Sequence, residues 1–197
     1  MADGYTIEDN IIVINRELTK LDIFLRDFLE ILKRHSDYLV VSGYVSICFG
    51  RTRATEDVDV LFLMMEKDRF DLLLEELQNG NFWCYQGDSS DEVYPYLKNI
   101  DNIRFARVGE TFPNIELIPI NESRKAKFFE FTHPQGIRVK NFELKIPPIE
   151  FEILYKEIIL GSDKDVADAK HLRIFFSDII KKEKFKEYET ITRQENK

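Results

Sequence analysis

Two aspartates separated by one residue, Asp57 and Asp59, are the residues in this chain whose spacing points most directly to chemistry. They alternate with Val58 and Val60, and alternate residues of a β-strand project to opposite faces, so both carboxylates are expected on one face of a strand. The apolar residues that follow favour a buried strand, where two unpaired carboxylates would carry a heavy desolvation cost. A divalent metal between them removes that cost, and Mg²⁺ suits a few carboxylates plus phosphate oxygens. The alternative is an exposed edge strand with solvated acids.

Glu116 is the candidate for a third carboxylate. It lies in the apolar segment Asn114–Ile118, which reads as a second strand. An acid on a strand adjacent to the first could bind a second metal and accept or orient a hydroxyl proton. The alternative is an acid that faces solvent, and Glu122 takes the role if the strand register differs.

Ser42 and Gly43 form a candidate anion site. They follow the apolar run Leu39–Val41 and precede a small amphipathic segment, Tyr44–Phe49. Backbone N–H groups at such a strand-to-helix turn, with the helix dipole behind them, attract a phosphate, and glycine allows its close approach. Many turns of this kind contain glycine for steric reasons alone, so the turn by itself is a weak indication.

Charged residues later in the chain allow two interpretations. On a helix, Asp165 and Asp168 share a face, and Lys164 can pair with Asp168 one turn away. Acids in a first helical turn also complement the dipole, so capping and solvation explain this segment without a ligand. Arg53 could neutralise a phosphate or the acid pair, although turn arginines are usually solvated.

Helical and strand patterns predict the elements that hold these residues. An apolar stripe from Arg16 to about Arg34, capped by Asn15, predicts an amphipathic helix. Gln86–Glu92 reads as an acidic loop and the residues after Ser177 as a charged tail. Further elements are expected at Lys67–Leu77 (helix), Phe82–Tyr85, Ile103–Val108 and Asn114–Ile120 (strands), Glu122–Phe131 (short helix), Ile137–Val139 and Phe142–Ile146 (strand pair), and Ile149–Leu160 and Lys164–Phe176 (helices).

The pair Pro147–Pro148 is the clearest boundary, because it blocks a helix before it and suits a helix start after it. We therefore expect an α/β core with an N-terminal helix at residues 1–146 and a helical segment at 147–197. Short strands mixed with helices make the fold class α+β.

Composition narrows the function classes. The chain has 197 residues and a net charge of −8, which argues against a broad nucleic-acid footprint. Cys48 and Cys84 lack metal-site spacing, and reduced thiols are favoured over a disulfide. Without an apolar run of membrane-spanning length or a signal peptide, we expect a cytoplasmic protein with no membrane partner.

The ordered residues of the first half resemble a known signature. Val41–Val60 is similar to the pattern of a Gly-Gly turn, a small helix and then G-x-x-R-x-T-x-D-hydrophobic-D, on Gly43, Gly50, Arg53, Thr55, Asp57 and Asp59. This is the pattern of the nucleotidyltransferase superfamily with the DNA polymerase β-like fold, and it looks closest to abortive-infection (AbiEii-type) toxins and minimal nucleotidyltransferases. The similarity resumes at Leu144–Phe176, with Lys156 and Lys164-Asp165-x-x-Asp168.

The resemblance implies a mixed sheet flanked by helices, with the helical C-terminal part closing a nucleotide cleft. It assigns Asp57, Asp59 and Glu116 to catalysis and to Mg²⁺. The residues it assigns to the nucleotide are Ser42, Gly43, Arg53, Thr55, Lys156, Lys164, Asp165 and Asp168. The chain departs from the family at two positions, with serine for the first glycine of the turn and Glu116 where the third carboxylate is usually aspartate.

The leading hypothesis is a Mg²⁺-dependent nucleotidyltransferase that moves a nucleoside monophosphate from a nucleoside triphosphate to a hydroxyl of RNA, of a protein or of a small molecule. The family further implies a toxin with a protein antitoxin, and tRNA among the acceptors. A nucleotide-binding or scaffold protein with little or no activity is the second hypothesis, favoured by Ser42 and Glu116. A metal-dependent phosphohydrolase is the third, which the scarcity of histidines disfavours.

Overall fold

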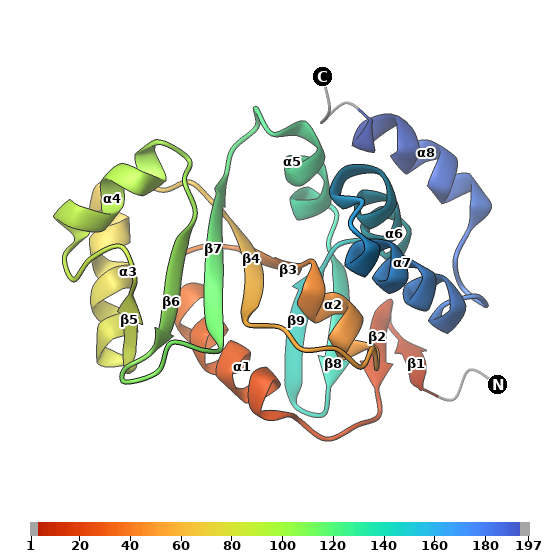
Figure 1. Cartoon of the computed structure of the whole chain (residues 1–197), viewed down its shortest axis with the longest axis horizontal. Helices are drawn as coiled ribbons and strands as arrows, with labels where there is room; N and C mark the ends of the chain where they lie inside the picture. Colours follow the sequence, from red (N-terminus) through yellow and green to blue (C-terminus); the bar gives the residue numbers. More distant parts are fainter. Residues whose placement is uncertain (1–3, 194–197) are drawn as a thin grey trace. The chain divides into compact units, whose positions relative to one another are not determined.

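A computed structural model describes residues 4–193, and its internal contacts divide the chain into two compact units. Unit 1 is drawn from Met1–Glu17, Leu39–Ala54 and Glu122–Lys197, and unit 2 consists of Leu18–Tyr38 and Thr55–Asn121. The chain therefore leaves and re-enters each unit. The elements are labelled in Figure 1, and each unit is described by itself below.

Unit 2 is built on a mixed sheet. Unit 2 contributes four strands to this sheet, in the order β4 (Asp57–Leu63), β7 (Asn114–Ile120), β6 (Ile103–Arg107) and β5 (Phe82–Cys84). β4 and β7 are parallel, whereas β7 and β6, and β6 and β5, are antiparallel. The helices of the unit are α1 (Lys20–Leu32), α3 (Lys67–Asn79) and α4 (Ser90–Lys98). Figure 1 shows α3 and α4 beside β5 and β6.

Aromatic residues join α1 to one face of this sheet. The ring of Phe28 lies 5.3 Å from that of Phe82 and 5.6 Å from that of Phe105. Both sheet residues are fully buried, and strand alternation places their neighbours Trp83 and Arg104 on the opposite face. One face of the unit 2 sheet is thus the core, and the other carries polar residues.

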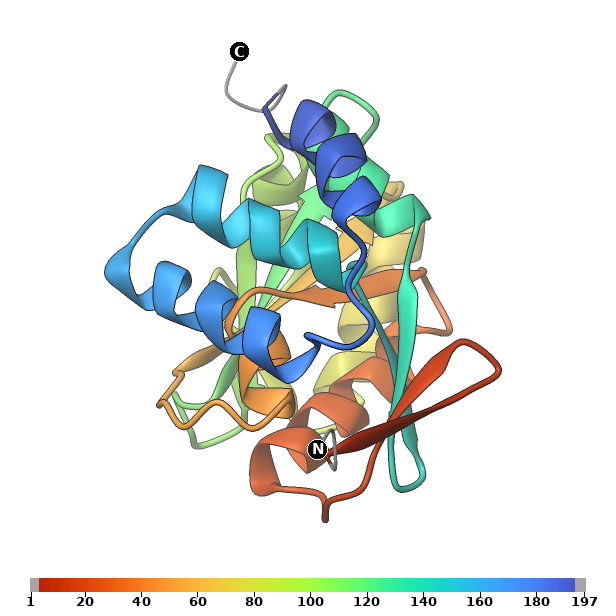
Figure 2. The same ribbon diagram turned by 90° about the vertical axis from the view of Figure 1, so that its right-hand side faces the viewer.

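Unit 1 contains a second mixed sheet of four strands, in the order β1 (Tyr5–Glu8), β2 (Ile11–Ile14), β8 (Gln135–Val139) and β9 (Phe142–Ile146). β1 and β2 form a hairpin, and β2 runs parallel to β8. Asp9 and Asn10 both have positive φ, which suits the two-residue turn of a hairpin. Figure 2 shows the red β1–β2 hairpin beside the teal β8–β9 hairpin.

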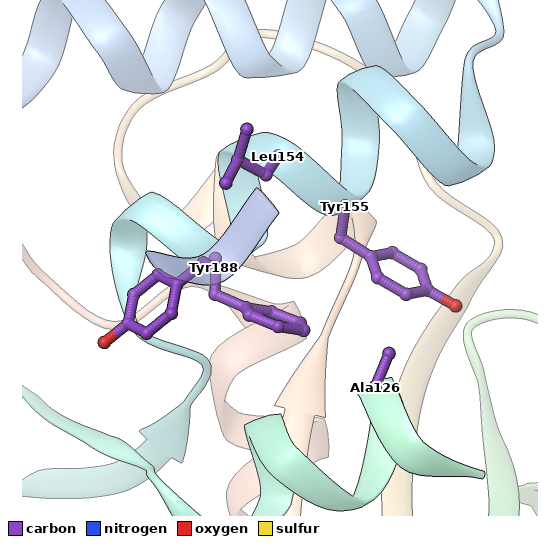
Figure 3. Packing of buried hydrophobic residues seen from close by; sticks show 5 residues of the cluster. Ala126, Leu154, Tyr155 and Tyr188 are labelled. Atoms are coloured by element: carbon purple, nitrogen blue, oxygen red, sulfur yellow. The ribbon is translucent and has the colours of Figure 1, made fainter. Parts of the chain in front are cut away.

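The remaining elements of unit 1 are helical, apart from β3 (Tyr38–Val41), most of which belongs to this unit and leads into α2. They are α2 (Gly43–Cys48), α5 (Lys125–Thr132), α6 (Ile149–Tyr155), the π-helical turn η1 (Lys156–Leu160), α7 (Asp163–Phe175) and α8 (Lys182–Thr192). Figure 3 shows Tyr188 of α8 packing near Leu154 and Tyr155 of α6 and Ala126 of α5.

Two mixed sheets with flanking helices confirm the predicted α+β class. The predicted strand bounds at Asn114–Ile120 and Phe142–Ile146 are confirmed, and α6 begins directly after Pro147–Pro148 as expected. The division of the chain into residues 1–146 and 147–197 stays a prediction.

Three local predictions were wrong. The first helix begins at Lys20 rather than Arg16, because Thr19 and Asp22 form a reciprocal capping box and Asn15 does not cap it. The expected acidic loop ends at Ser90, where a second capping box starts α4. The expected charged tail contains α8, which buries Tyr188.

Among residues 4–193, no helix is long and apolar enough to cross a membrane. Cys48, in unit 1, and Cys84, in unit 2, are both buried, and neither forms a disulfide with a described residue.

Candidate active site

The three predicted carboxylates of unit 2 lie together. Asp59 of β4 is in register with Glu116 of β7, and each of Asp57, Asp59 and Glu116 offers a carboxylate oxygen within 4.8 Å of the others. All three residues are half-buried. Parallel pairing of β4 with β7 produces this geometry, because residues in register on neighbouring strands point to the same face.

The alternation predicted from the sequence holds on β4. Val58 and Val60 are fully buried, and the two aspartates occupy the other face. Three carboxylates this close repel one another, and a divalent cation that takes oxygen ligands would remove the repulsion. The hard oxygen donors of this set fit Mg²⁺, and the metal role of these residues stays a prediction.

Asn114 adds a further oxygen to this face, and sequence reasoning missed it. It is in register with Asp57 and only 3% exposed. Its side-chain amide donates to the carbonyl of Glu56 at 3.2 Å, whereas its Oδ1 atom is buried with no hydrogen-bond partner among the described residues. Buried polar atoms are normally paired, so this acceptor fits a site that holds a cation or its water. The signal in the sequence was its position two residues before Glu116 on the same strand.

Two neighbouring side chains contact carboxylates of this set, Thr55 at Asp57 and Arg104 at Glu116. The Thr55 hydroxyl donates to the Asp57 carbonyl at 2.9 Å and lies 3.4 Å from its carboxylate Oδ1. Arg104 of β6 donates from Nη2 to Glu116 Oε1 at 2.8 Å. Thr55 thus contacts an acid of the candidate site, and its predicted contact with nucleotide stays a prediction. Arg104 was missed, because the pairing of β6 with β7 cannot be read from spacing.

In unit 1, the predicted phosphate turn has the expected local structure. Ser42 follows β3 and precedes the first residue of α2, Gly43. Ser42 has φ 63° and ψ −129°, a combination that glycine adopts most easily, and its side chain makes no capping hydrogen bond. The role of this turn in binding phosphate stays a prediction.

A second group of charges in unit 1 surrounds the fully buried Asp168 of α7. Its carboxylate oxygens lie 3.3 Å from Arg51 Nε, 3.6 Å from Arg53 Nε and 3.7 Å from Lys156 Nζ. Lys156 is also fully buried and lies 3.2 Å from Glu152 Oε1. Three predicted residues, Arg53, Lys156 and Asp168, thus share one cluster with two that were missed, Arg51 and Glu152.

Two other predicted residues do not join this cluster. Lys164 is exposed, and it does not form the i,i+4 pair with Asp168 that the sequence allowed. Asp165 lies in the first turn of α7, where its backbone N–H donates to the Ser162 hydroxyl at 3.3 Å. Its position supports the capping interpretation of that acid.

Lys156 occupies a distinctive backbone position. It is the first residue of η1, where the helix changes from α to π hydrogen bonding, and Gly161 ends the segment at φ 63°. Single π turns inside helices are often found at functional sites. At this position the fully buried lysine contacts Glu152 and Asp168.

The similarity of this chain to known proteins lies in structure and not in sequence. No family model matches the sequence, and no curated protein matches it. The crystal structure of an antigenic nucleotidyltransferase-like protein from Paracoccidioides brasiliensis is similar, with a TM-score of 0.50 and 17% identity over 81% of this chain and 78% of that one.

Two structures of ANT(2'')-Ia are also similar, at 10% identity. The solution structure of this antibiotic-resistance factor has a TM-score of 0.47 and matches 89% of this chain and 92% of its own. The crystal structure in complex with adenylyl-2''-tobramycin has a TM-score of 0.47 and matches 91% and 100%. The likeness to the fungal protein shows a nucleotidyltransferase-like fold, and the predicted fold is confirmed at that level.

Proposed function

We propose that this protein is a divalent-metal-dependent nucleotidyltransferase that uses Mg²⁺. The observation that carries the proposal is the set of Asp57, Asp59 and Glu116, whose oxygens lie within 4.8 Å of one another on adjacent strands of a nucleotidyltransferase-like fold. Nucleotidyl transfer requires a site where carboxylates and phosphate oxygens share cations, and this set offers the carboxylate half.

In the proposed reaction, an acceptor hydroxyl oxygen forms a bond to the α-phosphorus, and the bond from that phosphorus to the bridging oxygen breaks, releasing pyrophosphate. Bound Mg²⁺ would supply charge neutralisation for the attacking and leaving oxygens. Asp57, Asp59 and Glu116 would hold the metal, with Thr55 fixing the orientation of Asp57. Glu116, held by Arg104, would orient the hydroxyl and take its proton.

The roles of the remaining predicted residues stay proposals. Ser42 and Gly43 are assigned to the triphosphate by the motif. Three of the residues assigned to the nucleotide belong to one ion-pair cluster, in which Arg53 and Lys156 each contact Asp168. This common cluster supports a shared role for the three. Lys164 and Asp165 have weaker support. Lys164 does not pair with Asp168, and the backbone N–H of Asp165 donates to the Ser162 hydroxyl at the start of α7.

The finer features of the proposal rest on the motif. It implies kinship with AbiEii-type toxins, an acceptor such as tRNA, a protein or a small molecule, and a protein antitoxin as partner. These expectations guide the choice of acceptors in an assay, which should contain all three kinds.

The test is transfer of label from α-labelled nucleoside triphosphates in the presence of Mg²⁺ and a cell extract. We expect label to reach an acceptor with the native protein and to be lost in Asp57→Asn and Asp59→Asn. Asp101→Asn is the matched control, since Asp101 is an exposed acid of unit 2 outside the site. Its transfer rate should equal that of the native protein.

Three outcomes would overturn the proposal. Nucleotide binding without transfer to any acceptor would make the protein an inactive relative. Release of inorganic phosphate from the γ position, in place of pyrophosphate, would indicate a hydrolase. Equal transfer by the native protein and Asp59→Asn would show that these carboxylates do not carry the reaction.

A further inference from the structure

The face of the unit 2 sheet that carries the acids also carries a stacked pair of aromatic rings. Trp83 lies on β5 and Tyr85 directly follows it, with ring centroids 4.5 Å apart and planes inclined by 11°. Trp83 is in register with Ala106, and the backbone N–H of Tyr85 donates to the carbonyl of Arg104 at 2.9 Å. Because Arg104 is in register with Glu116, the rings, the guanidinium and the third carboxylate share one face.

Both rings are fixed by their polar ends. Trp83 Nε1 donates to the carbonyls of Arg107 and Glu110, each at 3.0 Å. The Tyr85 hydroxyl donates to the carbonyl of Thr111. The hydrogen-bonding groups of both side chains are therefore already paired within unit 2. These half-buried side chains can still offer a ligand the face of a ring.

The segment that anchors the rings carries two exposed apolar side chains. Val108 is 57% exposed and Phe112 is 56% exposed, on either side of the Glu110 and Thr111 carbonyls that accept from Trp83 and Tyr85. Exposed apolar residues gathered around fixed aromatic rings are typical of a surface that contacts a ligand.

We propose that Trp83 and Tyr85 form a platform for the acceptor, and that the acceptor is a neutral glycoside of more than one sugar ring. This inference rests on the proposed function, because it takes the carboxylates as the place where the acceptor hydroxyl reacts. β5 lies two strand spacings from β7, which is about 10 Å. A molecule that stacks on the rings and reaches Glu116 must therefore be longer than a single sugar ring.

Charge favours a glycoside over a nucleic acid. Arg104, the cation between the rings and the acids, is already paired with Glu116 at 2.8 Å and so leaves no unneutralised charge for a phosphodiester. The net charge of −8 also disfavours a polyanion. The hydroxyls of a sugar can accept from the remaining guanidinium N–H groups, while its C–H face packs on an aromatic ring.

The test uses the fluorescence of Trp83, which is the single tryptophan of the chain. The protein is titrated, without nucleotide, with glucose, with a panel of linear trisaccharides (maltotriose, cellotriose and chitotriose) and with short single-stranded RNA. We expect a saturable change with at least one trisaccharide, at least about tenfold weaker binding of glucose, and no change with RNA.

Variants separate the platform from general packing. Tyr85→Ala should weaken trisaccharide binding by about tenfold, since it removes a stacked ring, and Tyr85→Phe should bind as the native protein does. Tyr96→Ala is the matched control, because Tyr96 is an exposed tyrosine of α4 in the same unit, and it should leave binding unchanged. Circular dichroism spectra establish that each variant is folded.

Four results would overturn the platform: no response to any trisaccharide, tighter binding of RNA than of the trisaccharides, equal loss of affinity in Tyr85→Ala and Tyr96→Ala, or equal affinity in the native protein and Tyr85→Ala. The titration needs no turnover, so its failure is distinct from failure of the proposed function. Trisaccharide binding without any nucleotidyl transfer would refute the proposed reaction and leave the platform standing.

Discussion

At the scale of single residues, side-chain placement follows from strand geometry, as it does for Asp57, Asp59 and Glu116. Each aspartate faces away from a buried valine, and the parallel register of β4 with β7 brings Glu116 beside Asp59. Glu116 is one methylene longer than an aspartate, and the ion pair with Arg104 fixes where that longer side chain ends. The proposed chemistry therefore depends on supporting residues as much as on the acids.

Cys84 provides a prediction on pH dependence. Burial raises the pKa of its thiol from 9.0 to about 11. A raised pKa lowers the fraction of thiolate at pH 8, and the thiolate is the reactive form. We expect Cys84 in the folded protein to react about 100-fold more slowly with a thiol reagent than a thiol of unshifted pKa. Its reaction rate should still be rising as the pH passes 9.

The measurement is the rate of modification of Cys84 in a Cys48→Ser variant, followed from pH 7 to pH 11 with a disulfide reagent. Unfolded protein provides the control, because its thiol has no burial to shift it. A folded-state rate that levels off near pH 9 would contradict the prediction.

At the scale of elements, α7 and the turn after α2 are joined through buried charge. Asp168 lies within 3.7 Å of Arg51, Arg53 and Lys156, and it is fully buried. Removing one partner of a buried ion pair leaves the other charges uncompensated. Asp168→Asn should therefore lower the free energy of unfolding by about 3 kcal/mol, measured by urea denaturation.

Asp163→Asn is the matched control for that experiment. Asp163 lies on the same helix and is exposed in its first turn, where an acid contributes only about 0.5 kcal/mol through the helix dipole. If the two variants lost the same stability, the cluster around Asp168 would not hold these elements together.

The start of α1 supports a second prediction at this scale. Thr19 accepts from the N–H of Asp22 at 3.2 Å, and the Asp22 carboxylate accepts in return from the Thr19 N–H at 2.6 Å. Thr19→Ala should cost about 1 kcal/mol of stability. Asn15→Ala, at the position the sequence suggested as the cap, should cost less than about 0.5 kcal/mol, as exposed substitutions usually do. A thermal or urea midpoint that fell further for Asn15→Ala would contradict this assignment.

At the scale of the whole molecule, elements with a regular residue pattern could be predicted from the sequence, whereas the pairing of those elements could not. Alternation located β4, and apolar strand patterns located β7 and β9. Helix ends were harder, because Asn15 and Thr19 are both good caps and only the position of Asp22 decides between them. The hairpin of β1 and β2 was not assigned, because most residues of β1 are exposed and leave no clear alternation.

The candidate site follows the same rule. Asp57 and Asp59 were predictable because they lie on one strand, and Glu116 because its segment is plainly a strand. Asn114 was missed although it lies two residues before Glu116 on the same strand. Arg104 could not be found in this way, since its place depends on which strands pair and in which register. Arg51 was equally hidden, because it lies more than a hundred residues before its partner Asp168 in the chain.

The net charge supports a prediction for the molecule as a whole. With a charge of −8 and a sequence pI of about 5.1, the protein should have no measurable general affinity for nucleic acid at about 0.15 M salt. Fluorescence anisotropy of a labelled random-sequence single strand would measure this. Binding that weakens steeply with added salt would contradict the prediction and would reveal a basic surface.

The proposed function requires that Asp57, Asp59 and Glu116 hold a divalent cation. The most direct test is the binding of Mn²⁺, followed by the electron paramagnetic resonance signal of the free ion, in the presence of a nucleoside triphosphate. Asp59→Asn and Glu116→Gln should each weaken binding by at least about tenfold, since loss of a ligand costs no less than loss of its supporting partner. Asp101→Asn should bind Mn²⁺ as the native protein does, and unchanged affinity in Asp59→Asn and Glu116→Gln would contradict the account.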